Sequence, residues 1–337
     1  EIDWPAGTCN KTITQNENYR EKYITIEKIP IPADMPFRAQ LHTFEGAGMF
    51  GMGEDTDYSK VALNIHIVDD ETGEECHIPD YFDYQMFGPE LEFISNKDCT
   101  AYITNIRVDS YEHGGDESVN YLDKNATRAF LSSTYDKYLE EMGEEFGKTI
   151  TTVFNDETRM CHAIPWSNEF PAVFLERHGY DIRNEIYRII LPGTDNGRVR
   201  VDYYDTVAYL YQTRYFKEIY DWCEKHNLKL FAHLLGEETL FGHVRYSGDY
   251  MRQNRFQHVV GADYLGKGIG SLNLKFTSAA AHSYGKEMTA VEIFAGCGWD
   301  LTFDEYTRMI TFAFQQGIQM IINHGFFYSA EGERAND

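Results

Sequence analysis

From about Thr100 onward, short apolar runs alternate with longer amphipathic segments, and this alternation constrains the fold more than any other feature. A helix is expected over Ala126 to Phe146, because apolar side chains recur there every three or four residues with charged side chains on the opposite face. A second helix is expected over about Val201 to Lys225. Strands that alternate with such helices are typical of βα units and a parallel sheet. The sequence therefore predicts an α/β fold.

Five of the apolar runs are predicted strands that contain polar residues at their ends or lead directly to them. They are Thr149 to Phe154 before Asn155-Asp156-Glu157, Leu228 to Leu234 before Glu237-Glu238, Ala262 to Leu265 around Asp263, Met288 to Val291 before Glu292, and Met320 to Ile322 before Asn323-His324. A (β/α)₈ barrel builds its active site on the loops that follow its strands. We therefore predict a TIM-type (β/α)₈ barrel that is incomplete at its N-terminus.

Residues 23–109 have a different pattern, with short alternating runs separated by turn-rich loops. The stretch Asp69 to Gly73 has the composition of a hairpin turn. We predict that residues 23–109 form a small β-rich insertion on the barrel. Residues 1–22 are then a fragment from the start of the barrel, and residues 110–337 are the C-terminal portion of the catalytic barrel. On this interpretation the chain is a fragment of a longer protein.

Net charge, apolar segment length and cysteine spacing indicate which partners and which compartment to expect for this chain. A net charge of −24 disfavours nucleic acid, because binding to phosphates draws on clustered lysine and arginine. No segment approaches the roughly 20 consecutive apolar residues of a membrane-spanning helix, so no membrane partner is expected. The six cysteines are scattered singly, which favours free thiols and a bacterial cytoplasmic protein, with a secreted or periplasmic protein as the alternative.

Short motifs run in order along nearly the whole chain. They are Asp3-Trp4-Pro5-Ala6-Gly7, Asn120-Tyr121-Leu122-Asp123, Phe146-Gly147-Lys148-Thr149-Ile150, Phe154-Asn155-Asp156-Glu157, Arg177-His178-Gly179-Tyr180-Asp181, Asp221-Trp222-Cys223-Glu224-Lys225-His226, Gly236-Glu237-Glu238, Ala281-His282-Ser283-Tyr284-Gly285-Lys286, Val291-Glu292-Ile293-Phe294, Asn323-His324-Gly325 and Tyr328-Ser329. In order and spacing they resemble bacterial glycoside hydrolases similar to the α-L-rhamnosidases of family 106.

The resemblance implies a (β/α)₈ catalytic domain, usually followed by β-sandwich domains, that acts on terminal sugars of plant or microbial glycans. Glu157 would end the fourth barrel strand and Glu292 the seventh, the positions of the catalytic carboxylates in many barrel glycosidases. Characterised members of the family are calcium-dependent and inverting. Neither property is carried over to this chain, so calcium stays a possible cofactor and both stereochemical outcomes stay open.

Glu157 and Glu292 are the predicted catalytic pair. Glycosidic cleavage needs one protonated carboxyl group to protonate the leaving oxygen, and one ionised carboxylate to activate water or attack the sugar. Acidic or apolar neighbours can push the two pKa values apart. We expect Glu157 to be the general acid and Glu292 the base or nucleophile. Glu237 is the third candidate and could replace Glu157 as the acid.

Other side chains near the predicted strand ends could contact the sugar. These are Asp156, His233, Glu238, Trp166, Trp299, Asn323 and His324. Flat aromatic faces pack well on sugar rings, although packing in the core is an equally valid interpretation for each tryptophan. The carboxylates of Asp156, Glu237 and Glu238 could alternatively form an oxygen-rich calcium site.

Two other functions stay open. The first is a non-catalytic barrel that binds glycans. The second is a metal-dependent hydrolase, which is disfavoured because the sequence contains no HxH or HExxH pair. An enzyme requires Glu157 and Glu292 to meet at one site, and a separation into different sites would exclude this pair.

Overall fold

The computed structural model describes residues 10–40, 62–77, 90–109, 118–194 and 196–325. The chain divides into two compact units. The first unit holds residues 1–19, 118–161 and 207–337, and the second unit holds residues 20–117 and 162–206. Two of the motifs quoted above, Asp3 to Gly7 and Tyr328-Ser329, lie outside the described residues.

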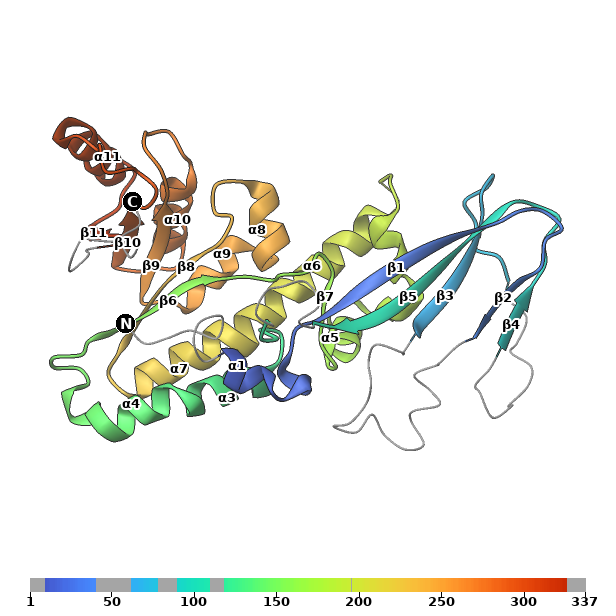
Figure 1. Ribbon diagram of the computed structural model, residues 1–337, viewed down its shortest axis with the longest axis horizontal. Helices are drawn as coiled ribbons and strands as arrows, with labels where there is room; N and C mark the ends of the chain where they lie inside the picture. Colours follow the sequence, from blue (N-terminus) through green and yellow to red (C-terminus); the bar gives the residue numbers. More distant parts are fainter. Residues whose placement is uncertain (1–9, 41–61, 78–89, 110–117, 195, 326–337) are drawn as a thin grey trace. The chain divides into compact units, whose positions relative to one another are not determined.

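A parallel five-stranded sheet forms the centre of the first unit (Figure 1). Its order is β11-β10-β9-β8-β6, with β6 (Thr152–Thr158), β8 (Lys229–Leu234), β9 (Val259–Tyr264), β10 (Met288–Ile293) and β11 (Met320–Asn323). All five predicted strands and the α/β class are confirmed. The predicted barrel is not seen, because the strands of the described residues form an open sheet whose edge strands do not pair with each other.

Two amphipathic helices pack against this sheet. They are α10 (Asn273–Ser283), which follows β9, and α11 (Phe303–Gln315), which follows β10. Thr302 caps α11 by accepting a hydrogen bond from the Glu305 amide, and the Glu305 side chain accepts one from the Thr302 amide. Leu274 of α10 and Met309 of α11 are buried in the same core cluster as Val291 of β10. The apolar faces of both helices thus fix the strands whose ends carry the predicted site.

The other helices of the first unit differ from the sequence prediction at two points. Their bounds are α1 (Asn10–Thr14), α3 (Lys124–Ser133), α4 (Tyr135–Met142), α7 (Lys217–Lys225), α8 (Leu240–Ser247) and α9 (Tyr250–Gln253), with short 3₁₀ turns at Glu17–Tyr19, Gly143–Glu145 and Asn254–Phe256. The helix expected over Ala126 to Phe146 is broken at Thr134, whose φ of −125° is not helical. The helix expected over Val201 to Lys225 is continuous, but a π-helical turn, η7 (Gln212–Phe216), separates α6 (Gly197–Tyr211) from α7.

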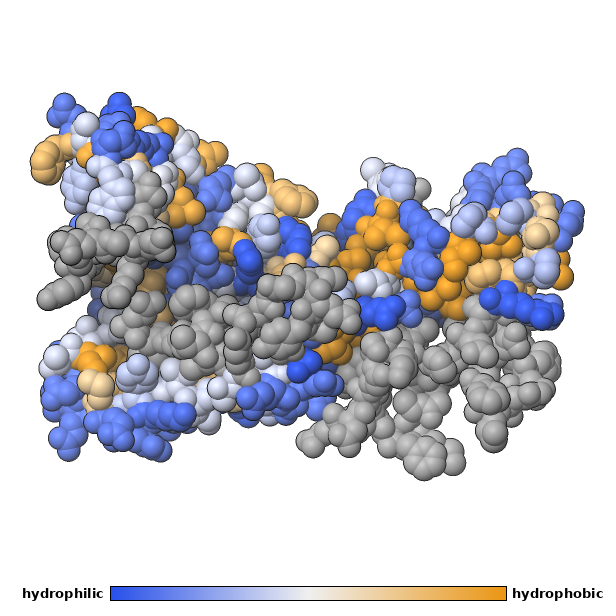
Figure 2. Space-filling model, viewed as in Figure 1, coloured by the Kyte–Doolittle hydropathy of each residue, from blue (hydrophilic) through white to orange (hydrophobic). Residues whose placement is uncertain are grey.

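The second unit is built on an antiparallel sheet in the order β3-β5-β1-β7. Its strands are β1 (Lys22–Ile31), β3 (Ala62–Asp69), β5 (Cys99–Val108) and β7 (Pro165–Trp166), while β2 (Phe37–Gln40) pairs with β4 (Glu90–Phe93). The helix α5 (Phe170–His178) and the 3₁₀ helices η5 (Ile182–Asn184) and η6 (Ile186–Ile190) belong to the same unit. Hydrophobic residues gather over β1, β3 and β5 (Figure 2), where Ile31, Ile65 and Ile67 share one buried cluster.

The strands predicted within residues 23–109 are thereby found, and the unit that contains them also includes residues 162–206. Among the described residues, no helix combines the length and the apolar character needed to cross a membrane. The five cysteines of the described residues are free thiols.

Gly261 lies in β9, where this strand passes close to β8. A Cβ atom at Gly261 would lie 2.2 Å from the carbonyl oxygen of Ala232 and 2.5 Å from the ring of Phe231. Gly261→Ala is expected to destabilise the sheet by about 1–3 kcal/mol, because the neighbouring backbone must shift to admit the methyl group. Hydrogen exchange of the β8 and β9 amides in the full-length protein measures this loss as faster local opening.

Gly197→Ala is the matched control for this prediction. A Cβ atom at Gly197 would meet only the flexible end of Arg200, at 3.9 Å. Exchange of β8 and β9 should therefore be unchanged in this control. Equally slow exchange in Gly261→Ala and in the wild type would contradict the expected crowding.

Candidate active site

The end of β6 carries a β-bulge at the predicted acidic residues. The register between β6 and β8 shifts between Asn155 and Thr158. Glu157 lies in this interval with a φ of 40°, a left-handed conformation that is rare for residues other than glycine. A bulge inserts an extra residue and re-aims the side chains beside it, and bulges are common next to active sites.

Two buried tyrosines hold the bulge from both sides. The side-chain Nδ2 of Asn155 donates a hydrogen bond to the Tyr215 hydroxyl at 2.7 Å, and the Tyr211 hydroxyl donates to Thr158 Oγ1 at 2.8 Å. Both tyrosines are fully buried in the continuous helix formed by α6, η7 and α7. Strained backbone persists only where the surroundings over-determine it, and these contacts supply that restraint.

The backbone after β10 is strained as well. Phe294 has a φ of 87°, and its ring stacks on Tyr306 of α11 with centroids 4.3 Å apart. Glu292, two residues earlier, has a side chain that is 14% exposed. Both predicted catalytic glutamates therefore lie at or beside backbone that only a specific packing arrangement can maintain.

His233 of β8 links two of the predicted site residues. Its Nε2 atom lies 2.9 Å from Glu292 Oε2 and 3.4 Å from Asp156 Oδ1, and the imidazole is almost completely buried. Burial lowers the pKa of His233, but the hydrogen bond to Glu292 and the charges of Glu237, Asp263 and Asp156 outweigh it and raise this pKa to about 9. A protonated His233 thus donates its Nε2 proton to the Glu292 carboxylate.

Asp263 of β9 is a site residue that sequence reasoning did not select. It is the register partner of Glu292 on β10, and the negative charges of Glu157 and Glu292 both act on its carboxyl group. Burial raises the pKa of Asp263 to about 7; the positive charge of His233 opposes the rise, and the charges of Glu157 and Glu292 reinforce it. The signal in the sequence was an acid inside a strand whose other residues are apolar or small, because all six positions of β9 are buried.

The Glu237 side chain is bound by backbone amides and does not face an open site. Its Oε1 accepts a hydrogen bond from the Leu234 amide at 2.6 Å, and its Oε2 accepts one from the Asp263 amide at 3.0 Å. The residue is only 1% exposed, and burial raises the pKa of its carboxyl group to about 8. The expectation that Glu237 could replace Glu157 as the acid does not fit this geometry, because both oxygens are occupied and the side chain is enclosed.

The predicted calcium ligands are not brought together. Glu237 is engaged by backbone amides, and Glu238 is exposed to solvent. Oxygen and nitrogen atoms of Asp156, His233 and Glu292 do lie within 4.8 Å of one another, a spacing that a metal ion could occupy. Calcium takes six to eight oxygen ligands, so an imidazole at the centre of the group does not fit it. Among the described residues, the protonated His233 supplies the positive charge between these carboxylates.

Three other predicted side chains follow the sheet ends. His324 Nε2 lies 3.9 Å from Glu292 Oε1 with a side chain 43% exposed, so the structure brings it to the site. Asn323 is exposed at the end of β11 and accepts a hydrogen bond from the Tyr306 hydroxyl at 3.4 Å. Trp299 is 65% exposed in the loop after β10. These groups are open to a ligand.

Trp166 is a correction to the predicted set. It is 1% exposed in β7 of the second unit and stacks on Phe170 of α5, with ring centroids 4.8 Å apart. Because the ring is enclosed in the core, neither of its faces is available to stack on a sugar. Trp166 is a core residue of the second unit.

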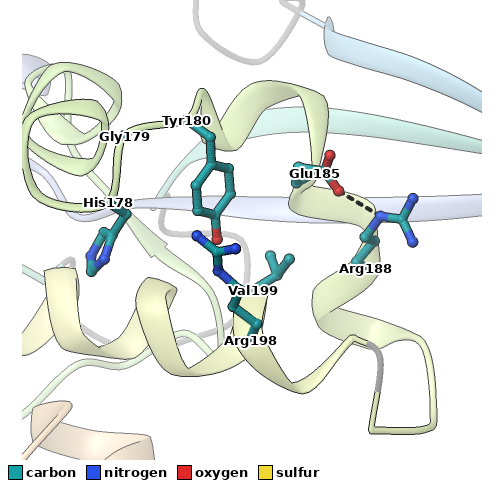
Figure 3. A pocket seen from close by; sticks show the side chains of 7 residues that line it. All are labelled: His178, Gly179, Tyr180, Glu185, Arg188, Arg198 and Val199. Carbon is teal, nitrogen blue, oxygen red and sulfur yellow. Dashed lines mark ion pairs between the residues drawn. The ribbon is translucent and has the colours of Figure 1, made fainter.

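The second unit contains a pocket of about 310 Å³ near η6 and the start of α6 (Figure 3). It is lined by His178, Gly179, Tyr180, Glu185, Arg188, Arg198 and Val199. Arg188 forms an ion pair with Glu185 at 2.5 Å, and Arg198 lies over the Tyr180 ring and pairs with Asp202 at 3.4 Å. Since these charges are satisfied within the wall, the pocket is not assigned a ligand.

Comparison with known proteins decides the family. The family model described as alpha-L-rhamnosidase, glycoside hydrolase family 106, matches residues 105–334. The chain belongs to this family. Its matched region includes every strand of the parallel sheet and every residue of the cluster around His233.

A structural relative agrees with this assignment at the level of the fold. The rhamnosidase from Novosphingobium sp. PP1Y aligns with a TM-score of 0.52 and 16% sequence identity, over 69% of this chain and 23% of that protein. The family 106 chain described here therefore spans less than a quarter of the length of that relative. No curated protein matches the sequence.

Proposed function

We propose that this chain carries the acid and the base of a glycosidase that cleaves a terminal glycosidic bond, with an α-L-rhamnoside as the substrate. One observation carries the proposal. His233 Nε2 lies 2.9 Å from Glu292 Oε2 and 3.4 Å from Asp156 Oδ1, so the ends of β6 and β10, which carry Glu157 and Glu292, meet at one imidazole. Two carboxyl groups around one site are the requirement for glycosidic cleavage.

The barrel belongs to the same proposal. The strands β6, β8, β9, β10 and β11 are parallel, and each neighbour in the sheet is the next sheet strand in the sequence. A barrel has this uninterrupted order, whereas an open doubly wound sheet reverses its order at a switch point. We place these five strands side by side in the wall of a (β/α)₈ barrel, with the cluster on its catalytic rim.

The roles follow from the partners of each carboxylate. Glu157, beside the acid Asp263, is the proposed general acid that protonates the leaving oxygen. Glu292, which accepts a hydrogen bond from His233, is the proposed base or nucleophile. Asp156 lies near the same imidazole, while Asn323, His324 and Trp299 are the open groups that would contact the sugar.

A panel of 4-nitrophenyl glycosides tests the proposal on the full-length protein. We expect turnover of the α-L-rhamnoside to exceed that of the other sugars, because a pocket that hydrogen-bonds the hydroxyl groups of one sugar leaves polar groups unpaired with another. Proton NMR of the first sugar formed then distinguishes retention from inversion. Tight binding of the sugar without turnover of any member would instead support the non-catalytic glycan-binding protein.

A further inference from the structure

The His233 side chain reaches across the parallel sheet to a strand that is not its neighbour. In the sheet order β8 is followed by β9 and then by β10, yet His233 Nε2 of β8 lies 2.9 Å from Glu292 Oε2 of β10. The register places Gly261 of β9 beside His233, because Ala232 pairs with Val260 one position earlier. Since Gly261 has no side chain, the imidazole can pass over β9 to the carboxylate.

Two phenylalanine rings pack against the imidazole. The rings of Phe154 and Phe231 stack with centroids 4.8 Å apart, and these centroids lie 5.2 Å and 6.4 Å from that of His233. The His233 side chain is 1% exposed, and its Nδ1 atom has no hydrogen-bond partner among the described residues. The orientation of the imidazole is therefore set by packing on the two rings and by the contacts of Nε2.

The two carboxylate oxygens of Glu292 have different surroundings. Oε2 accepts the hydrogen bond from the enclosed His233, whereas Oε1 lies 3.9 Å from Nε2 of His324, whose side chain is 43% exposed. If the carboxylate turned away, His233 Nε2 would keep only the longer contact of 3.4 Å to Asp156 Oδ1. A buried donor that loses its acceptor is costly. Glu292 is thus held by its enclosed oxygen and presents the other oxygen on the open side.

We infer that His233 is a positioning residue that holds Glu292 through Oε2, so that Oε1 is the oxygen that reacts. The inference rests on the proposed glycosidase function and adds a residue to it. If Glu292 is the base, a water oxygen bonds to the anomeric carbon and a proton of this water passes to Oε1. If Glu292 is the nucleophile, Oε1 itself bonds to the anomeric carbon. In both cases the glycosidic C–O bond breaks and the general acid protonates the leaving oxygen.

Three substitutions of His233 in the full-length protein separate the hydrogen bond from the charge of the side chain. His233→Gln removes the imidazole but keeps an N–H donor at about the reach of Nε2. His233→Asn carries the same amide on a side chain that is one carbon shorter, so its donor falls short of Glu292. His233→Leu has no donor.

His233→Leu and His233→Asn should each lower kcat for 4-nitrophenyl α-L-rhamnoside by about 10²-fold, because the reacting oxygen is no longer held in place. KM should change little, since no group proposed to contact the sugar is altered. His233→Gln should recover most of the lost kcat. A merely structural role would not produce this order, because it gives glutamine no advantage over asparagine at equal melting temperature.

The outcomes separate this inference from the proposed function. Wild-type kcat in His233→Leu, together with a large loss in Glu292→Gln, overturns the inference alone. Equal losses in all three variants assign the effect to the charge or the packing of the imidazole and overturn the inference as well. Wild-type turnover in Glu292→Gln removes the proposed catalytic pair and the inference with it.

His282, an exposed histidine of α10, supplies the matched control. His282→Gln and His282→Asn make the same chemical changes outside the site, so both should keep the kcat and KM of the wild type. If His233→Leu does not fold, the glutamine and asparagine variants of His233 still decide the question. Equal kcat in these two folded variants would overturn the inference.

Discussion

Glu292→Gln is expected to lower kcat for an α-L-rhamnoside by about 10²- to 10⁴-fold, with a much smaller change in KM. The amide cannot accept the proton of an attacking water and cannot act as a nucleophile. It also removes the ionised partner of His233, whose Nε2 atom lies 2.9 Å from Glu292 Oε2. Steady-state kinetics on the full-length protein measure the loss.

Glu141→Gln supplies the matched control for the same chemical change, because this glutamate is exposed on α4. Its kcat should equal that of the wild type. Azide added to Glu292→Ala provides a second readout, since a small anion can fill the space left by the truncated side chain and restore turnover. Undiminished activity of Glu292→Gln would remove Glu292 from the mechanism, whatever azide does.

The strands of the site could be predicted because their sequence signals are local. Buried parallel strands read as short apolar runs, and each of the five runs ends at or near acidic or amide side chains. Placement of Asp156, Glu157 and Glu292 at the same sheet edge follows from the parallel order alone. Helix periodicity located the continuous helix from α6 to α7 to within a few residues for the same reason.

The contacts of the site could not be predicted, because they join residues far apart in the chain. The sequence around Glu157 contains no signal for the bulge. The bulge depends on Tyr211 and Tyr215, which lie more than fifty residues later in the chain. Glu237 and Glu238 are neighbours with similar sequence surroundings, yet one is buried against two amides and the other is exposed. Which of them faces solvent is decided by the path of the loop after β8.

The degree of burial could not be predicted for two residues of the candidate site, one aromatic and one acidic. Trp166 follows a short apolar stretch that suits a rim loop as well as a core, and only the packing on Phe170 identifies the core. Asp263 lies in a strand that is buried at every position, where an acid is costly unless it has partners. Those partners, Glu157 and Glu292, come from other strands and become visible only in the fold.

The stability of the site should depend on pH in an unusual direction. Folding raises the pKa of Glu237 from 4.5 to about 8, chiefly through burial, and raises that of Asp263 to about 7 for the same main reason. The negative charges of the site raise the pKa of His233 to about 9 despite its burial. In each case the folded state holds its proton to a higher pH than the unfolded state does.

The sign of the effect follows from these shifts. Between the unfolded and folded pKa values the native state binds more protons, so the free energy of unfolding falls as pH rises. For Glu237 the stabilisation is fully present below pH 4.5 and is lost as pH rises through about 8. The slope from one such group is at most about 1.4 kcal/mol for each pH unit in that window.

Glu237→Gln isolates this contribution, because glutamine resembles the protonated carboxyl group and does not titrate. Scanning calorimetry of the full-length protein should show a melting transition that declines less steeply in the variant than in the wild type between about pH 5 and pH 8. The variant replaces one of the two acceptor oxygens with an NH2 group, so either the Leu234 or the Asp263 amide loses its partner, which costs about 1–3 kcal/mol at every pH and leaves the slope unaffected. Parallel pH profiles for the two proteins would mean that Glu237 is already ionised in the native state, and that the amides of Leu234 and Asp263 stabilise a buried carboxylate.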